Sequence, residues 1–171
     1  WDGTDAVMLS GETAIGQHPL LPLRMMDRIV RSAESAALDA RPAPRPRLRS
    51  HQAALTHAAR VLAEDLSARA IVGLTRTGRT AQLLSAERAG APIYAFSPDL
   101  RVCSRLALWW GVDPICHPLA QTLDENVAAM EATLCERGAM ARGDLMVIAG
   151  SQPFKPGVHT NFVKFHRVGG R

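Results

Sequence analysis

Apolar residues in the first forty positions suggest a strand followed by a helix. Asp5 to Leu9 reads as a buried strand that opens into a polar loop. After Pro19, apolar residues recur three or four positions apart: Leu23, Met26, Ile29, Val30 and Ala33. A single strand and helix cannot satisfy the strand's backbone groups or close a core. We therefore expect a βα unit that belongs to a larger fold.

From residue 50 onward, helical and strand patterns alternate. Ser50 can cap a helix whose apolar side is formed by five residues: Leu55, Ala58, Ala59, Leu62 and Leu66. Short apolar runs predict strands at 70–74, 92–96, 112–116 and 144–149, and Pro114 favours a sheet edge for the third run. Between them, Ser97-Pro98 can start one helix, and Thr122 to Glu125 forms a capping box for another.

A final alternating run at 162–168 follows the strand at 144–149 without a helix between them. Parallel neighbours require a long crossover, so this last strand should run antiparallel. The sequence thus predicts an α/β fold: a doubly wound, mostly parallel five-stranded sheet with an antiparallel last strand, preceded by the βα unit.

The composition is that of a globular domain with a short appendage. The chain has 171 residues, of which 47% are hydrophobic, and no apolar run is long enough to span a bilayer. The N-terminus has no charged-then-apolar signal pattern, so we expect a soluble, cytoplasmic protein with no membrane partner. At 41–49, four arginines alternate with three prolines, which favours an extended connector. Without interleaved aromatic residues, this cluster gives no support for nucleic-acid binding.

The three cysteines are widely spaced and odd in number. Cys103, Cys116 and Cys135 include no Cys-x-x-Cys pair, so neither a disulfide framework nor a zinc site is indicated. We expect buried or half-buried thiols. The six histidines likewise show no metal-ligand spacing with acids or cysteines, and the chain has no Gly-x-Ser-x-Gly motif.

The candidate chemistry lies in the turn after the strand at 70–74, which we call the 75–80 loop: Thr75, Arg76, Thr77, Gly78, Arg79 and Thr80. Gly78 allows a tight turn, and the first turn of the following helix offers free N–H groups to an anion. The three hydroxyls and two guanidinium groups can bind phosphate oxygens. We therefore predict a phosphorylated small-molecule ligand.

Two other interpretations of this loop stay open. It can be a plain helix cap without a ligand. It also nearly matches a nucleotide-binding P-loop, Gly73-x-x-x-x-Gly78-Arg79-Thr80, but Arg79 stands where that motif requires lysine. The acid of the later strand, Asp144, stands at the start of the strand and not at its end, which disfavours nucleotide hydrolysis.

The loop between the last two strands leaves the same edge of the sheet as the 75–80 loop. Its segment 154–159, which we call the 154–159 loop, consists of Phe154, Lys155, Pro156, Gly157, Val158 and His159. Lys155 and His159 can therefore approach an anion at Arg76 and Arg79, although a solvated loop explains them equally well. Separately, Ser10, Gly11, Glu12 and Thr13 stand where a barrel strand would end, a usual place for active-site loops.

The stretch from Asp2 to Gly16, followed by Pro19, closely resembles the last barrel strand and loop of pyruvate kinase. The 75–80 loop resembles that family's effector phosphate loop, and Arg142 to Asp144, Gly150 and Thr160-Asn161 resemble its closing strand pair. The resemblance implies that residues 1–40 are the final βα unit of the catalytic barrel, 41–49 a linker, and 50–171 the C-terminal allosteric domain.

The resemblance also implies a function. The family transfers phosphoryl from phosphoenolpyruvate to ADP in glycolysis, with Mg²⁺ and often K⁺, usually as a homo-tetramer. Its catalytic and metal-binding residues lie upstream of Trp1, so this chain would be inactive alone and hold no cofactor. The phosphorylated effector would bind the 75–80 and 154–159 loops. The 154–159 loop differs from the Arg-Pro-Gly-Ser-Gly loop of fructose-bisphosphate-regulated members, so the effector stays open between sugar phosphates and nucleotides. A free-standing phosphate-sensing module is the alternative.

Overall fold

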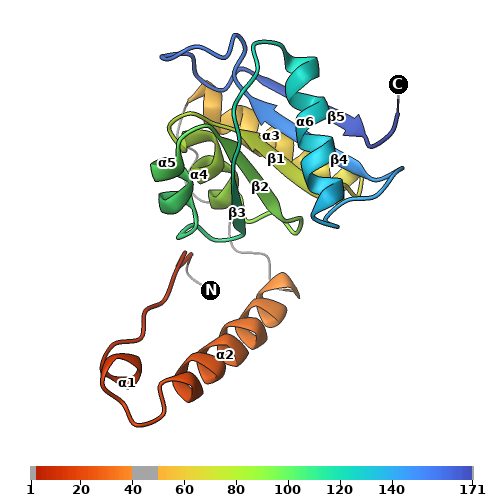
Figure 1. The fold of residues 1–171 in the computed structure, drawn as a ribbon. Helices are drawn as coiled ribbons and strands as arrows, with labels where there is room; N and C mark the ends of the chain where they lie inside the picture. The colour runs from red at the N-terminus through yellow and green to blue at the C-terminus, as the bar shows by residue number, and fades with distance from the viewer. Residues whose placement is uncertain (1–2, 40–49, 171) are drawn as a thin grey trace. The chain divides into compact units, whose positions relative to one another are not determined.

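The computed structural model describes residues 3–39 and 50–170. The chain forms two compact units, Trp1–Arg45 and Pro46–Arg171 (Figure 1). The Pro/Arg connector predicted at 41–49 lies outside the described residues, so the domain boundary placed there stays a prediction. In the described parts of the chain, no helix is both long and apolar enough to cross a membrane.

The first unit contains a short helix, α1 (Gly11–Ala14), and a long helix, α2 (Leu20–Asp39). The helix predicted after Pro19 is confirmed, but much of its apolar side is open: Ile29 is 61% exposed. The strand expected at Asp5 to Leu9 is wrong, because no strand forms there and Met8 is 87% exposed. The described residues of this unit contain no strand with which the backbone groups of Asp5 to Leu9 could pair.

The second unit is built on a five-stranded sheet with the order β3-β2-β1-β4-β5. The strands are β1 (Ala70–Leu74), β2 (Ile93–Ser97), β3 (Val112–Cys116), β4 (Leu145–Gly150) and β5 (Phe162–Arg167). β1 pairs in parallel with β2 and β4, β2 pairs in parallel with β3, and β5 runs antiparallel to β4. The predicted mostly parallel sheet with an antiparallel last strand is confirmed, and β3 with its proline lies at an edge.

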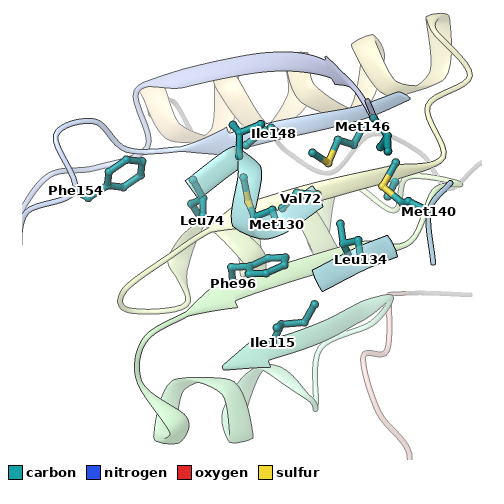
Figure 2. Packing of buried hydrophobic residues seen from close by; sticks show 13 residues of the cluster. Val72, Leu74, Phe96, Ile115, Met130, Leu134, Met140, Met146, Ile148 and Phe154 are labelled. Atoms are coloured by element: carbon teal, nitrogen blue, oxygen red, sulfur yellow. The ribbon is translucent and has the colours of Figure 1, made fainter. Parts of the chain in front are cut away.

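Helices cover both faces of this sheet. They are α3 (His51–Asp65), α4 (Arg79–Ala86), α5 (Leu100–Leu106) and α6 (Leu123–Glu136). Alternate residues of β1 serve the two faces: Val72 packs in the cluster that includes Met130 and Leu134 of α6 (Figure 2), and Ile71 packs with residues of α3 and α4. All five residues of β1 are buried, as expected for the central strand of a doubly wound sheet.

Most predicted helix starts are observed, and one lies two residues further on. The Ser50 hydroxyl accepts a hydrogen bond from the Ala53 N–H, and Thr122 and Glu125 form the reciprocal capping box. The start predicted at Ser97-Pro98 is wrong: Ser97 is the last residue of β2, and Asp99 caps α5 by accepting from the Arg101 N–H. An aspartate carboxylate is an equally good cap, and pairing with β3 keeps Ser97 in the sheet.

The buried side of α3 also differs from the expected one. Thr56, Ala59 and Ala63 are buried, whereas Leu66 is 37% exposed. Thr56 is tolerated inside because its hydroxyl donates to the carbonyl oxygens of the preceding turn. Small residues on this side let α3 approach the sheet closely, and the larger leucines lie at its margin.

A hydrogen bond between Glu131 and His166 joins α6 to the last strand. Glu131 Oε2 lies 2.6 Å from His166 Nε2, and Glu131 Oε1 accepts from the Gly169 N–H at 3.1 Å. The hydrogen bond from His166, together with that from Gly169, lowers the pKa of Glu131 below its ordinary value, against a smaller opposing effect of burial. A carboxyl whose pKa is lower in the folded state stabilises the fold above its ordinary pKa, and this stabilisation is lost as the pH falls through the lowered value.

We predict that Glu131→Gln lowers the free energy of unfolding at pH 7 and that its difference from the unmodified chain shrinks below pH 4.5, the ordinary value for this carboxyl. Because the pair is partly exposed, the effect at pH 7 should be about 1 kcal/mol or less. Urea unfolding across this pH range measures it, with the exposed Glu136→Gln on the same helix as control. A difference that does not change with pH would contradict the prediction.

Candidate functional site

The 75–80 loop leaves the carboxyl end of β1 and turns sharply into α4. Gly78 caps that helix with φ at +90°, in the left-handed region that favours glycine. A Cβ at this position would also lie 3.3 Å from Leu106 and 3.4 Å from Val102, both on α5. The turn therefore depends on glycine for its backbone conformation and for its close approach to α5.

Thr75 closes this turn from the inside. Its Oγ1 accepts a hydrogen bond from the Gly78 N–H at 2.9 Å, and its own N–H donates to the Phe96 carbonyl. The side chain is buried, so the Thr75 hydroxyl holds the loop in shape and the Gly78 amide is already occupied. Of the hydroxyls predicted to meet a ligand, Thr75 is thus committed to the protein.

The next amides of the loop are unoccupied. Among the residues that the structure describes, the N–H groups of Thr77, Arg79 and Thr80 have no hydrogen-bond partner. N–H groups at the start of a helix bear the positive end of its dipole. Three such groups beside exposed Thr77 and Arg79 can bind a small anion.

The two arginines of the loop have different surroundings. Arg76 Nη2 donates to the Phe154 carbonyl oxygen at 2.9 Å, across 78 positions of sequence. Arg79 is exposed, and in the described parts of the chain its guanidinium makes no hydrogen bond or ion pair. Arg76 therefore ties the 75–80 loop to the 154–159 loop, and Arg79 is open to solvent.

A second contact joins the same two regions. Thr80 Oγ1 lies 2.8 Å from Thr160 Oγ1, and both side chains are buried. Phe154 anchors the 154–159 loop because its ring is buried at one end of the core cluster on the α6 face (Figure 2). The two predicted segments are therefore neighbours in the structure. Whether they bind an effector stays a prediction.

The rest of the 154–159 loop is open to solvent. Lys155, Pro156, Gly157 and His159 are exposed, and Val158 is half-buried. Within residues 3–39 and 50–170, no hydrogen bond or ion pair joins Lys155 or His159 to the 75–80 loop. These two side chains are placed at the same edge of the sheet but are not brought onto Arg76 or Arg79.

Sequence reasoning missed Thr160 as a partner within the site. A signal was present: Thr160 comes just before the antiparallel last strand, which begins at the edge where β1 ends. A hydroxyl residue at that point is positioned to meet the loop after β1. The pairing was not predicted because Thr160 and Thr80 lie 80 positions apart in the sequence.

Asp144, the acid considered for the P-loop alternative, does not lie beside the 75–80 loop. Asp144 precedes β4 at the amino end of the parallel strands, opposite the 75–80 loop. Its Oδ2 accepts from the Ala141 N–H at 2.8 Å, and its carbonyl accepts from the Val168 N–H. Asp144 therefore shapes the turn before β4 and is not available to a metal ion beside a nucleotide.

The segment of Ser10, Gly11, Glu12 and Thr13 lies in the other unit and forms α1 with its cap. Glu12 Oε2 accepts from the Ser10 N–H at 2.9 Å, and the Thr13 hydroxyl donates to the Ser10 carbonyl. Hydrogen bonds from the backbone N–H groups of Glu12 and Ser10 lower the pKa of the Glu12 carboxyl, which is fully exposed. In the structure this segment is a local helix start, and its predicted role at a barrel mouth stays untested.

The cysteines depart from expectation. Cys103 is buried, but Cys116 and Cys135 are exposed, so the expectation of buried or half-buried thiols is wrong for two of them. Cys116 is exposed because it ends an edge strand, and Cys135 because it lies on the outer side of α6. In the described parts of the chain, no three His, Cys, Asp or Glu side chains gather as a metal site.

Comparison with known proteins gives a consistent match. Residues 53–166 match the family model described as "Pyruvate kinase, alpha/beta domain". A pyruvate kinase of Mycobacterium tuberculosis is 37% identical over 170 residues, covering 98% of this chain and 35% of that protein. A pyruvate kinase of Staphylococcus epidermidis is 37% identical over 173 residues, covering 99% of this chain and 29% of that protein. The chain thus spans about a third of the length of these relatives.

The Thr80–Thr160 contact makes a testable contribution to stability. We predict that Thr80→Val or Thr160→Val alone lowers the free energy of unfolding by about 1–3 kcal/mol, because each leaves a buried hydroxyl without its partner. The double variant should lose less than the sum of the two, since both polar groups are then removed. Urea unfolding of the four proteins measures this coupling, and additive losses would show that the hydroxyls do not depend on one another.

Proposed function

The chain belongs to the pyruvate kinase family, and from this premise we propose that it is the regulatory part of a pyruvate kinase, which binds a phosphorylated small molecule at the 75–80 loop. The observation that carries the proposal is made on residues 3–39 and 50–170: within them, three amides in the 75–80 loop are unoccupied, beside an exposed Arg79 that has no protein partner. A phosphate group suits this arrangement because it accepts several hydrogen bonds at once and is negatively charged.

The roles of the loop residues follow from their contacts. The amides of Thr77, Arg79 and Thr80 would donate to phosphate oxygens, with the Thr77 hydroxyl and the Arg79 guanidinium as side-chain donors. Thr75 would keep the turn in shape through its bond to the Gly78 amide. Arg76 would act as a link, because a ligand held here lies next to the bond between Arg76 and Phe154.

That link supports a regulatory role. Arg76 joins the 75–80 loop to the 154–159 loop, and the buried pair of Thr80 and Thr160 joins the same regions. A phosphate group that attracts Arg76 would weaken its bond to Phe154 and change the position of the 154–159 loop. Lys155 and His159 of that loop would then be the cations available to the remainder of the ligand.

For the whole protein, we propose phosphoryl transfer between phosphoenolpyruvate and ADP, as a cytoplasmic enzyme of glycolysis and a homo-tetramer. The catalytic residues would lie in the two thirds of the relatives' length that this chain does not span. Mg²⁺ and K⁺ would be held there as well, since the described residues gather no cluster of metal ligands. This chain would contribute the effector site and its coupling to the remaining domains.

We predict that sugar phosphates or nucleoside monophosphates raise the unfolding temperature of the chain and that Arg79→Gln weakens their binding at least about tenfold, since a hydrogen bond between charged groups contributes about 1.5–3 kcal/mol. A ligand at 100 times its dissociation constant should stabilise the chain by about 2.7 kcal/mol. Thermal unfolding in a ligand titration measures both effects.

The matched control is Arg69→Gln, which removes an exposed arginine at the start of β1, the opposite end of the strand from the 75–80 loop. Arg69→Gln should leave the affinity unchanged. Equal weakening by both variants would indicate general attraction of anions to a basic protein. The absence of any phosphate-dependent shift would leave the 75–80 loop as a helix cap alone.

We also predict that the isolated chain has no pyruvate kinase turnover, because the groups that bind and polarise the transferred phosphoryl would lie outside it. A coupled assay with phosphoenolpyruvate, ADP, Mg²⁺ and K⁺ measures this. Turnover above the background of the assay would mean that this chain contains the catalytic groups and that the proposed division of roles is wrong.

A further inference from the structure

Two of the three cysteines meet at the carboxyl end of β2. Cys103 lies on α5, and its Sγ is 3.8 Å from the carbonyl oxygen of Ser97, the last residue of β2. Cys116 is the last residue of β3 and is paired with Ser97 across the sheet. Cys116 falls on the same face of β3 as Val112, which packs against Val102 and Leu106 of α5. The helix that carries Cys103 and the strand that carries Cys116 thus meet at Ser97, with both cysteines on the same side of the sheet.

The two thiols differ in their access to solvent. Cys103 is 5% exposed, and Cys116 is exposed at the edge strand. Burial, followed by the neighbouring Cys116 and then Asp99, raises the pKa of the Cys103 thiol. Cys103 is therefore held as the protonated thiol at neutral pH, and Cys116 is the sulfur that a solute reaches first.

We propose that Cys103 and Cys116 form a reversible redox-active pair, which a hydroperoxide oxidises to an intramolecular disulfide. In the first step the Cys116 thiolate attacks the O–O bond of the hydroperoxide: an S–O bond forms, the O–O bond breaks, and the leaving oxygen takes up a proton as water or an alcohol. The Cys116 sulfur becomes a sulfenic acid. In the second step Cys103 loses its proton to solvent and attacks this sulfur, the S–S bond forms, and the hydroxyl leaves as water. Two electrons pass from the thiols to the hydroperoxide.

A metal role for the same residues has less support. His117 follows Cys116, but its Nδ1 lies 2.6 Å from the Pro118 carbonyl oxygen. In the described residues, no third ligand joins the two thiols. Cys135 is exposed on α6, which covers the other face of the sheet from α5, so it provides an internal comparison for the reactivity of an isolated thiol.

The pair lies beside the loop to which phosphate binding is assigned, but the proposal does not depend on that function. Val102 and Leu106, which flank Cys103 on α5, are the side chains that approach Gly78 most closely. A disulfide to β3 would fix α5 against the sheet at this point. Oxidation should therefore raise the unfolding temperature of the chain.

The test uses the full chain with Cys135→Ser, which leaves only the two proposed partners. After treatment with hydrogen peroxide and digestion with trypsin without reduction, we expect the peptide 102–105 joined to the peptide 106–137. The intact mass should fall by that of two hydrogen atoms, and dithiothreitol should reverse the change. A disulfide between two chains, or oxygen added to Cys116 while Cys103 stays free, would overturn the proposal. So would the lack of any reaction at either sulfur.

A second variant separates the two steps. Cys103→Ser keeps a donor toward the Ser97 carbonyl but cannot close the disulfide, so Cys116 should stop at the sulfenic acid, which dimedone traps. In the two-cysteine chain the same treatment should give little trapped product. Equal trapping in both proteins would show that Cys103 does not resolve the oxidised Cys116. Circular dichroism confirms that each variant is folded before oxidation.

Discussion

The whole second unit depends on the parallel pairing of β1 with both of its neighbours. β1 is fully buried between β2 and β4, so its residues must be apolar on both faces and its backbone groups must all be paired. Parallel strands end at the same edge, and this constraint brings the loop after β1 next to the loop after β4. The antiparallel β5 then begins at that edge and places Thr160 against Thr80. The direction of the strands therefore brings the two loops together, and the side chains of those loops then determine the chemistry of the site.

This constraint explains why the sequence predicts the sheet so well. Strands that are buried on both faces appear in the sequence as short apolar runs. In this chain, turn residues and helix caps separate these runs from the helices, and both act on backbone groups nearby in the sequence. The capping box at Thr122 and the proline of β3 are examples, since each depends on backbone groups within a few residues. The connection between β4 and β5 is too short for a parallel crossover, so its length alone predicts that β5 runs antiparallel. Such features need no knowledge of distant contacts.

The predictions that were wrong concern features that depend on contacts between distant parts of the chain. The strand expected at Asp5 to Leu9 has suitable residues, but strand formation requires a partner, which the described part of its unit does not supply. α5 is capped by Asp99 and not by Ser97, because Ser97 pairs with β3 as the last residue of β2. The buried side of α3 is set by how closely the helix packs on the sheet, which favours Ala59 and Ala63 over Leu66. In each case a contact with a distant part of the chain, either present or missing, overrode a local preference.

The two arginines of the 75–80 loop show that the same limit, the unpredictability of distant contacts, also affects the proposed binding site. By residue type alone, Arg76 and Arg79 are equivalent phosphate ligands. In the structure Arg76 donates a hydrogen bond to the Phe154 carbonyl, 78 positions away, whereas Arg79 has no protein partner among the described residues. A neutral carbonyl is a weaker acceptor for a guanidinium than a phosphate group is, because phosphate adds the attraction of opposite charges and can accept two parallel hydrogen bonds from the guanidinium. Arg76 is therefore held by an interaction that a bound anion can outcompete, which is the property needed in a residue that transmits binding from one loop to another.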